Sequence, residues 1–191
     1  ADLLTRPPRR PKKDRLVNAK LLLQAYGFIG LMEMLSSMFM FFYYMAEQGI
    51  PPSKVFMSFT NLTTDGYMGY SADQLNEFIY TGQSIYYINL IICQWGNVLS
   101  SRTRTRSILQ ANPFYGHNKN YYIFCAMVIS LAIALIILYI PGIQDVLFTR
   151  PVPVKYWFIP FGWAAMILTM DELRKLIIRS FPRSFVAKIA W

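Results

Sequence analysis

The chain has 191 residues, of which 54% are hydrophobic and only 15% are charged. A soluble domain usually carries about 25% charged residues, and here the charges fall in blocks between long apolar runs. The net charge of +9 would suggest nucleic-acid binding if it lay on a soluble surface, but a membrane protein needs basic loops to set its orientation. The composition argues against a disordered chain, a coiled coil or a nucleic-acid partner, and favours a membrane protein.

Four segments are apolar over about the 20 residues that a helix needs to cross the hydrocarbon core. They are residues 21–46, 79–100, 121–140 and 156–178. In the last of them, the charged side chains of Arg174, Lys175 and Arg179 are expected to snorkel to the membrane interface. The sequence therefore predicts an all-α, polytopic membrane protein with four transmembrane helices. A soluble helical bundle is the alternative, but its helices would show a polar stripe.

Blocks of basic residues flank these segments on one side. They lie before the first segment, between the second and third, and after the fourth, whereas loops 47–77 and 141–154 are acidic or nearly neutral. By the positive-inside rule both termini are cytoplasmic. The predicted organisation is a basic cytoplasmic segment 1–20, a membrane domain 21–179 and a cytoplasmic tail 180–191. The first outer loop contains Asn61-Leu62-Thr63, which matches the glycosylation acceptor pattern.

Glu33 is the one charged residue inside the first apolar segment. It shares a helical face with Gly27, Gly30 and Ser37, and small residues there would let another helix approach closely. A carboxyl group at membrane depth is costly, so it marks either an ion or proton path or a hydrogen bond to a neighbouring helix. Both interpretations of Glu33 remain open.

A polar stripe runs along the second segment. Asn89, Cys93 and Asn97 recur at intervals of four residues, with Gln94 beside them. Their amide oxygens can coordinate a cation, or the stripe can hold two helices together through hydrogen bonds. Both cysteines, Cys93 and Cys125, lie in apolar runs and are expected to be buried.

The end of the last segment carries a cluster of Asp171, Glu172, Arg174 and Lys175. Spacing of three or four residues predicts ion pairs along the helix, with Asp171 and Lys175 on one face; coupling to a soluble domain is the other interpretation. His117 has no metal-ligating neighbours at suitable spacing. Because the chain contains no phosphate loop and no catalytic triad pattern, we expect no catalytic residues and no bound cofactor in it.

Four strings occur in order along the chain. They are Leu16-Val17-Asn18 with Ala25-Tyr26-Gly27-Phe28-Ile29-Gly30, Gln94-Trp95 with Arg102-Thr103-Arg104, Tyr139-Ile140-Pro141-Gly142, and the run 171–179, DELRKLIIR. Together they resemble one family, the sodium/potassium-type P-type cation-transporting ATPases, over residues 14–183. The likeness is to the last four helices of the catalytic α chain, and the final string is the most specific.

The resemblance implies a supporting part of a pump's membrane domain. ATP, magnesium and the phosphorylated aspartate would belong to upstream parts of the parent enzyme. Asn97 stands where the family has a cation-site carboxylate, and with Gln94 and Glu33 it would line a monovalent-cation path. Ile129 and Ser130 stand where the family often has two glutamates.

The implied partners are the lipid bilayer, the remaining pump helices and a β-type subunit that would contact Gly69, Tyr70 and Ser71. The implied location is the plasma membrane. The alternative is a stand-alone, pump-derived accessory subunit of a larger membrane complex in this or another membrane. The missing acids at positions 97, 129 and 130 and the absence of a headpiece from this sequence fit that alternative.

Overall fold

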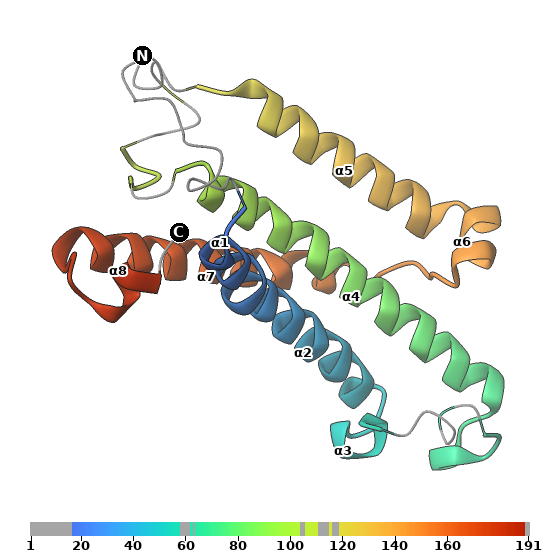
Figure 1. The fold of residues 1–191 in the computed structure, drawn as a ribbon. Helices are drawn as coiled ribbons and strands as arrows, with labels where there is room; N and C mark the ends of the chain where they lie inside the picture. Colours follow the sequence, from blue (N-terminus) through green and yellow to red (C-terminus); the bar gives the residue numbers. More distant parts are fainter. Residues whose placement is uncertain are drawn as a thin grey trace.

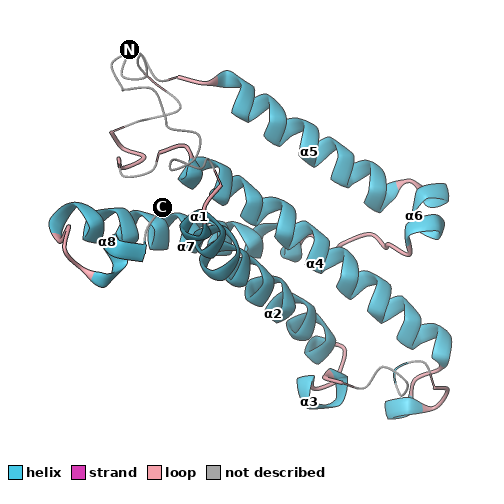
Figure 2. Ribbon diagram, viewed as in Figure 1, coloured by secondary structure: helices cyan, strands magenta, loops and turns pink. Residues whose placement is uncertain are grey.

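The computed structural model describes residues 17–57, 62, 64–103, 106–110, 115 and 119–189. Within these ranges all regular secondary structure is helical (Figure 2), which confirms the predicted all-α class. Asn61 and His117 lie outside the described residues. The elements are α1 (Ala19–Leu22), η1 (Leu23–Gly30), α2 (Leu31–Glu47), α3 (Pro52–Val55), η3 (Tyr67–Gly69), α4 (Ala72–Ser101), α5 (Tyr121–Tyr139), α6 (Pro141–Leu147), α7 (Lys155–Ser180) and α8 (Phe185–Ile189).

The elements α1, η1 and α2 follow one another without a break. The Asn18 side chain caps the start by accepting a hydrogen bond from the backbone N–H of Leu21 at 2.9 Å. The middle element, η1, is a π-helix, a form that is rare and usually limited to a single turn. A stretch of this length changes the angle between successive residues, so the period of an ordinary α-helix does not hold across it.

Gly27 is exposed whereas Glu33 is buried, so within the described residues the expected close packing of another helix on Gly27 and Gly30 is not present. A β-carbon at either glycine would meet, within 4 Å, only atoms of the same helix, from Leu23 and Ala25. Close approaches occur elsewhere. A β-carbon at Gly82 of α4 would lie 2.7 Å from the ring of Phe41.

The longest element, α4, begins with a capping box. Ser71 Oγ accepts a hydrogen bond from the N–H of Gln74 at 3.3 Å, and Gln74 Oε1 accepts one from the N–H of Ser71 at 3.1 Å. The helix therefore starts seven residues before the predicted segment 79–100. In Figure 1, α4 lies between α2 and α5, with α7 crossing behind, and its extensive packing is against α2 and α7.

The buried core lies where α2, α4 and α7 meet, and α5 stands apart from it. Met40 of α2, Ile85 and Ile88 of α4 and Tyr156 of α7 are fully buried. In α5 only Ala134 and Leu138 are buried. Cys93 is buried as expected, but Cys125 is exposed on α5, so the expectation for that cysteine is wrong.

Two helices among the described residues are long and apolar enough to cross a membrane. They are the continuous helix Ala19–Glu47 and α5, Tyr121–Tyr139. The helices α4 and α7 are longer than α5, but polar side chains interrupt both of them, and α7 ends in the charged run 171–179. The four-span arrangement is therefore not established by length and apolarity.

Candidate functional site

A polar seam runs between α2 and α4. At its centre the fully buried side chain of Asn89 donates hydrogen bonds from Nδ2 to Ser36 Oγ at 3.0 Å and to Ser37 Oγ at 2.8 Å. Cys93 Sγ lies 3.6 Å from the same nitrogen. The Asn89 amide thus joins two helices. This is the structural one of the two roles that the sequence left open for the polar stripe on α4. The partners Ser36 and Ser37 were not expected.

Towards the α4 carboxy-terminal end, the same seam contains the three residues predicted to line a cation path. Glu33 is 5% exposed, and its Oε2 accepts a hydrogen bond from Gln94 Nε2 at 2.7 Å. Gln94 Oε1 in turn accepts one from Asn97 Nδ2 at 3.3 Å. The other carboxylate oxygen, Glu33 Oε1, is buried and accepts no hydrogen bond of normal geometry from the described residues. These three side chains are called the Glu33 cluster below.

The Glu33 cluster offers oxygen ligands from one carboxyl group and two amides. Carboxylate and carbonyl oxygens suit hard cations, and an incompletely paired carboxyl group at membrane depth is typical of ion and proton pathways. Among the described residues, no three His, Cys, Asp or Glu side chains gather together. Any ion bound here would therefore depend mainly on Glu33 and amide oxygens.

A small cavity of about 90 Å³ continues the seam from Asn97 towards the end of α4. Gln24 and Ile29 of η1 line it on one side, and Ser101 and Thr103 line it on the other. The buried Oε1 of Gln24 has no hydrogen-bond partner in the described chain. The cavity therefore places polar groups between the Glu33 cluster and this end of the bundle.

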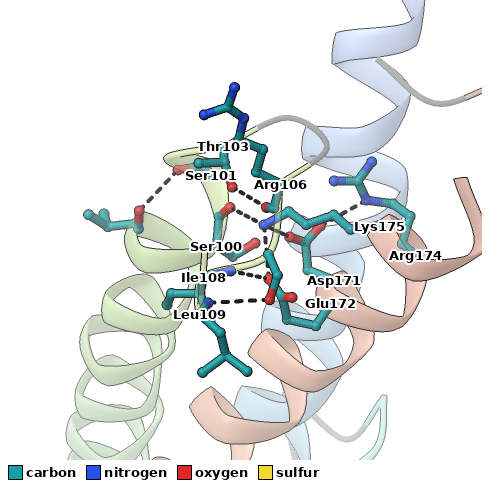
Figure 3. Close-up of polar contacts among 12 residues, drawn as sticks. Ser100, Ser101, Thr103, Arg106, Ile108, Leu109, Asp171, Glu172, Arg174 and Lys175 are labelled. Atoms are coloured by element: carbon teal, nitrogen blue, oxygen red, sulfur yellow. Dashed lines mark hydrogen bonds and ion pairs between the residues drawn. The ribbon is translucent and has the colours of Figure 1, made fainter. Parts of the chain in front are cut away.

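At the same end, charged residues of α7 bind the last turn of α4 (Figure 3). Lys175 Nζ lies 2.8 Å from Asp171 Oδ2 and 2.8 Å from the backbone oxygen of Ser100. Arg174 Nε lies 2.8 Å from Asp171 Oδ1. Glu172 Oε1 accepts a hydrogen bond from the N–H of Ile108 at 3.0 Å. The cluster ties α7 to α4 and to the segment that follows α4.

Lys175 does not snorkel, so that expectation is wrong. Its side chain is completely buried, and Asp171 is 1% exposed. The last carbonyl groups of a helix lack hydrogen-bond donors within the helix. Lys175 is buried because its Nζ donates a hydrogen bond to one of them, the backbone oxygen of Ser100. Arg174 is also largely buried against Asp171, whereas Arg179 is exposed. The expected pair of Asp171 and Lys175 on one helical face is present.

The opposite end of the bundle carries two ion pairs that join separate elements. Arg150 donates to both carboxylate oxygens of Glu77 at 2.7 Å, and these hydrogen bonds hold the pKa of Glu77 below its usual range. Glu47 at the end of α2 accepts hydrogen bonds from Lys155 and Tyr156 of α7. Sequence reasoning missed both pairs, although opposite charges in neighbouring outer loops were a signal for them.

The residues expected to contact a partner lie at this same end. Gly69 has a positive φ of 84° and is exposed, and Ser71 caps α4. Tyr70 is half-buried and donates its hydroxyl hydrogen to the backbone oxygen of Gln48 at 2.8 Å. Two of the three are thus accessible, and the contact itself stays a prediction.

The pair of positions 129 and 130 on α5 is not part of the Glu33 cluster. Ser130 Oγ accepts a hydrogen bond from Trp95 Nε1 at 2.9 Å, and Ile129 is 59% exposed. Ser130 therefore holds α5 to α4.

A family model described as "Cation transporting ATPase, C-terminus" matches residues 1–177. The chain is 30% identical over 196 aligned residues to the sodium/potassium-transporting ATPase subunit alpha-2 of Gallus gallus, covering 98% of this chain and 19% of that protein. It is 31% identical to subunit alpha-4 of Rattus norvegicus and 28% identical to subunit alpha-2 of Homo sapiens, with the same coverage. The chain therefore spans about a fifth of the length of these relatives.

Proposed function

Because the chain belongs to the family of cation-transporting ATPase carboxy-terminal domains, we propose that it supports cation transport by a sodium/potassium-type pump. It is a non-catalytic supporting membrane domain. ATP and magnesium would bind in the remaining four-fifths of the parent protein. This domain contributes helix packing and a part of the cation path.

The proposed topology has four transmembrane helices with both termini in the cytoplasm. The distribution of charge along α4 supports it. Glu77 binds Arg150 near one end, and Ser100 binds Lys175 near the other. A helix rises about 1.5 Å per residue, so these two positions are about 35 Å apart, a little more than the hydrocarbon thickness of about 30 Å. Between these positions, Asn89 and Gln94 bind side chains of α2, and Trp95 binds Ser130 of α5.

The observation that carries the cation-path proposal is the buried, incompletely paired carboxyl group of Glu33 beside Gln94 and Asn97. Burial of an ionisable group without complete pairing is unfavourable, so its presence indicates a use for it. The cavity beside Asn97 supports access from the cytoplasmic end. The transported cation is the substrate of the whole pump.

The test is Glu33→Gln in the complete pump, with Glu77→Gln at the opposite end as the matched control. The amide keeps the size of the side chain and removes the charge. We expect a weaker apparent affinity for sodium or potassium in Glu33→Gln, with normal assembly, and no such change in the control. Loss of assembly with unchanged cation affinity would show instead that Glu33 only joins helices.

The proposal extends to partners and location. The remaining pump helices and lipid would cover the exposed apolar faces, for example that of α5, and a β-type subunit would contact the region of Gly69, Tyr70 and Ser71. The parent pump would lie in the plasma membrane.

An accessory subunit without pump chemistry is the second candidate. The hydrogen bonds of Asn89 and Ser130 favour it, because both side chains join neighbouring helices and are not left to bind a cation.

A further inference from the structure

Residues 148–152 connect α6 to α7 and are called the 148–152 strap below. The strap begins at Phe148, whose positive φ of 53° ends α6, and such φ values are uncommon and unfavourable for residues other than glycine. It ends at Val152, which is 4% exposed and belongs to the core of the bundle. A segment in an unfavourable conformation needs contacts that hold it, and the strap makes such contacts on two sides.

One side of the strap binds α4. The Arg150 guanidinium group donates to both carboxylate oxygens of Glu77 at 2.7 Å and lies over the Tyr80 ring, 5.3 Å from its centroid. The backbone N–H of Arg150 donates to Oγ of the fully buried Ser84 at 2.8 Å. Positions 77, 80 and 84 share one face of α4, because they are three and four residues apart on a helix. Arg150 therefore holds the strap on α4 through both its side chain and its backbone.

The other side of the strap binds α5 and α6. Thr149 Oγ1 donates to the backbone oxygen of Ile137 in α5 at 2.9 Å. The hydroxyl group of Tyr139 donates to the backbone oxygen of Val152 at 3.2 Å. The backbone N–H of Thr149 donates to the backbone oxygen of Gln144 in α6 at 3.1 Å. These contacts join the end of α5, α6 and the strap in one unit.

The helix α5 is attached to the bundle unevenly along its length. Its two buried residues, Ala134 and Leu138, both lie in its carboxy-terminal half. Near its middle, Ser130 accepts a hydrogen bond from Trp95 of α4, and an open groove of about 300 Å³ lies between α4 and the amino-terminal half of α5. Figure 1 shows α5 standing apart from α2 and α7. The strap therefore makes the stronger polar attachment of this unit to α4.

We propose that the 148–152 strap fastens α5 and α6 to the bundle, with Arg150 as the fastening residue. When the contacts of Arg150 with α4 open, α5, α6 and the strap move as one unit about Val152, and α2, α4 and α7 stay packed. Gln94 lines the groove between α4 and α5, so this movement changes how far α5 covers one residue of the Glu33 cluster. The fastening itself does not depend on cation binding at that cluster.

The experiment is hydrogen–deuterium exchange of the complete protein in detergent, measured by mass spectrometry of its peptides. Arg150→Gln and Glu77→Gln each remove one partner of the ion pair, and the double variant removes both. Arg150→Lys keeps the charge but cannot form the two parallel hydrogen bonds. The matched control is Lys155→Gln, because the Lys155 side chain is 54% exposed and binds Glu47 at the same end of the bundle, but this pair joins α7 to α2.

Backbone amides exchange when the segment that contains them opens. We expect residues 137–150 to exchange about fivefold faster in Arg150→Gln than in the wild type, which is the effect of losing a partly exposed ion pair, with unchanged exchange in α2, α4 and α7. Glu77→Gln should give a similar increase, and the double variant should match Arg150→Gln, since the two side chains act as a pair. Arg150→Lys should give a smaller increase, and Lys155→Gln should leave residues 137–150 as in the wild type.

Unchanged exchange of residues 137–150 in Arg150→Gln would overturn the proposal. So would an increase of the same size in α2 and α7, because the variant would then loosen the whole bundle. An equal increase at residues 137–150 in Lys155→Gln would refute the specific role of Arg150. These outcomes are independent of the cation affinity of Glu33→Gln, which tests the proposed function separately.

Discussion

Gly96 of α4 lies directly against the backbone of Ala164 in α7. A β-carbon at position 96 would be 2.7 Å from the carbonyl oxygen of Ala164 and 3.2 Å from its Cα. Contact with backbone atoms cannot be relieved by rotating a side chain. The α4–α7 contact therefore depends on the absence of a side chain at position 96, and it supports both the seam and the charged cluster at the helix ends.

Gly96→Ala should destabilise the domain. Forcing a methyl group into a packed interface typically costs about 1–3 kcal/mol. The control is Gly162→Ala in α7, where a β-carbon would meet nothing within 4 Å and helix propensity favours alanine by up to about 1 kcal/mol. Thermal unfolding in detergent, followed by circular dichroism, should give a lower midpoint for Gly96→Ala and an unchanged or higher one for Gly162→Ala. Equal midpoints would show that the helices separate without cost.

Lys175→Met should be strongly destabilising. The substitution removes one of the two cations that pair with Asp171 and the donor to the Ser100 carbonyl oxygen. Removing one partner of a buried ion pair costs about 3–5 kcal/mol. The comparison is Arg179→Met, one turn further along the same helix on an exposed position, which should change the unfolding midpoint much less. A small effect of Lys175→Met would mean that Asp171 reaches water or another cation in the whole protein.

The pair of Glu77 and Arg150 should make stability depend on pH. Its hydrogen bonds lower the pKa of Glu77 from the usual 4.5, so the stabilisation is complete above that value and is lost as pH falls through the lowered pKa. The Glu77 side chain is 52% exposed, so the pair contributes only about 1 kcal/mol or less. The wild type should therefore unfold at a higher temperature than Glu77→Gln at about pH 7, and the difference should shrink as the pH falls through the lowered pKa of Glu77. A difference that persists in acid would exclude the ion pair as its cause.

The four-span topology predicts which side of the membrane each loop occupies. In a Cys125→Ser background, where Cys93 remains but is buried, one cysteine at a time replaces Asp73 or Val146 at one end of the bundle, or Ser101 or Arg183 at the other. An impermeant thiol reagent added outside intact cells should label the first pair, and it should label the second pair only after permeabilisation. Labelling of positions 73 and 101 from the same side would show that α4 does not cross the membrane.

Sequence patterns predicted where the helices lie, because apolar length is a local property of the chain. They missed the start of α4, although the string from Ser71 to Gln74 carries the capping box. The π-helix could not be predicted from the periodicity, since its glycines and apolar residues also suit an α-helix. The expected packing of another helix on Gly27 and Gly30 is not present among the described residues.

The cation-path residues depend on contacts between helices. The seam was half predictable: the spacing of Asn89 and Cys93 placed them on one face of α4. Their contacts with Ser36 and Ser37 depend on how α2 and α4 are aligned, and no local pattern encodes that alignment. The same holds for Lys175, whose burial follows from the position of Ser100 across the interface. Whether Glu33, Gln94 and Asn97 act on a cation stays a prediction.

Asn97→Asp tests the amide position of the Glu33 cluster. The change adds a second carboxyl group about one turn of α4 from Gln94. If a cation binds there, the added negative charge should strengthen its binding; if no cation binds, the new carboxylate should repel that of Glu33. In the complete pump we expect a shifted sodium dependence of activity with unchanged assembly. Unchanged sodium dependence would argue against a ligand role for position 97.

The central claim, that this domain serves a cation pump, is tested most directly on native membranes. An antibody against residues 112–120 should detect a band several-fold heavier than the 22.2 kDa of this chain, and that band should incorporate phosphate from ATP in a cation-dependent manner. A band at 22.2 kDa within a larger native complex, without such phosphorylation, would contradict the claim and identify an accessory subunit instead.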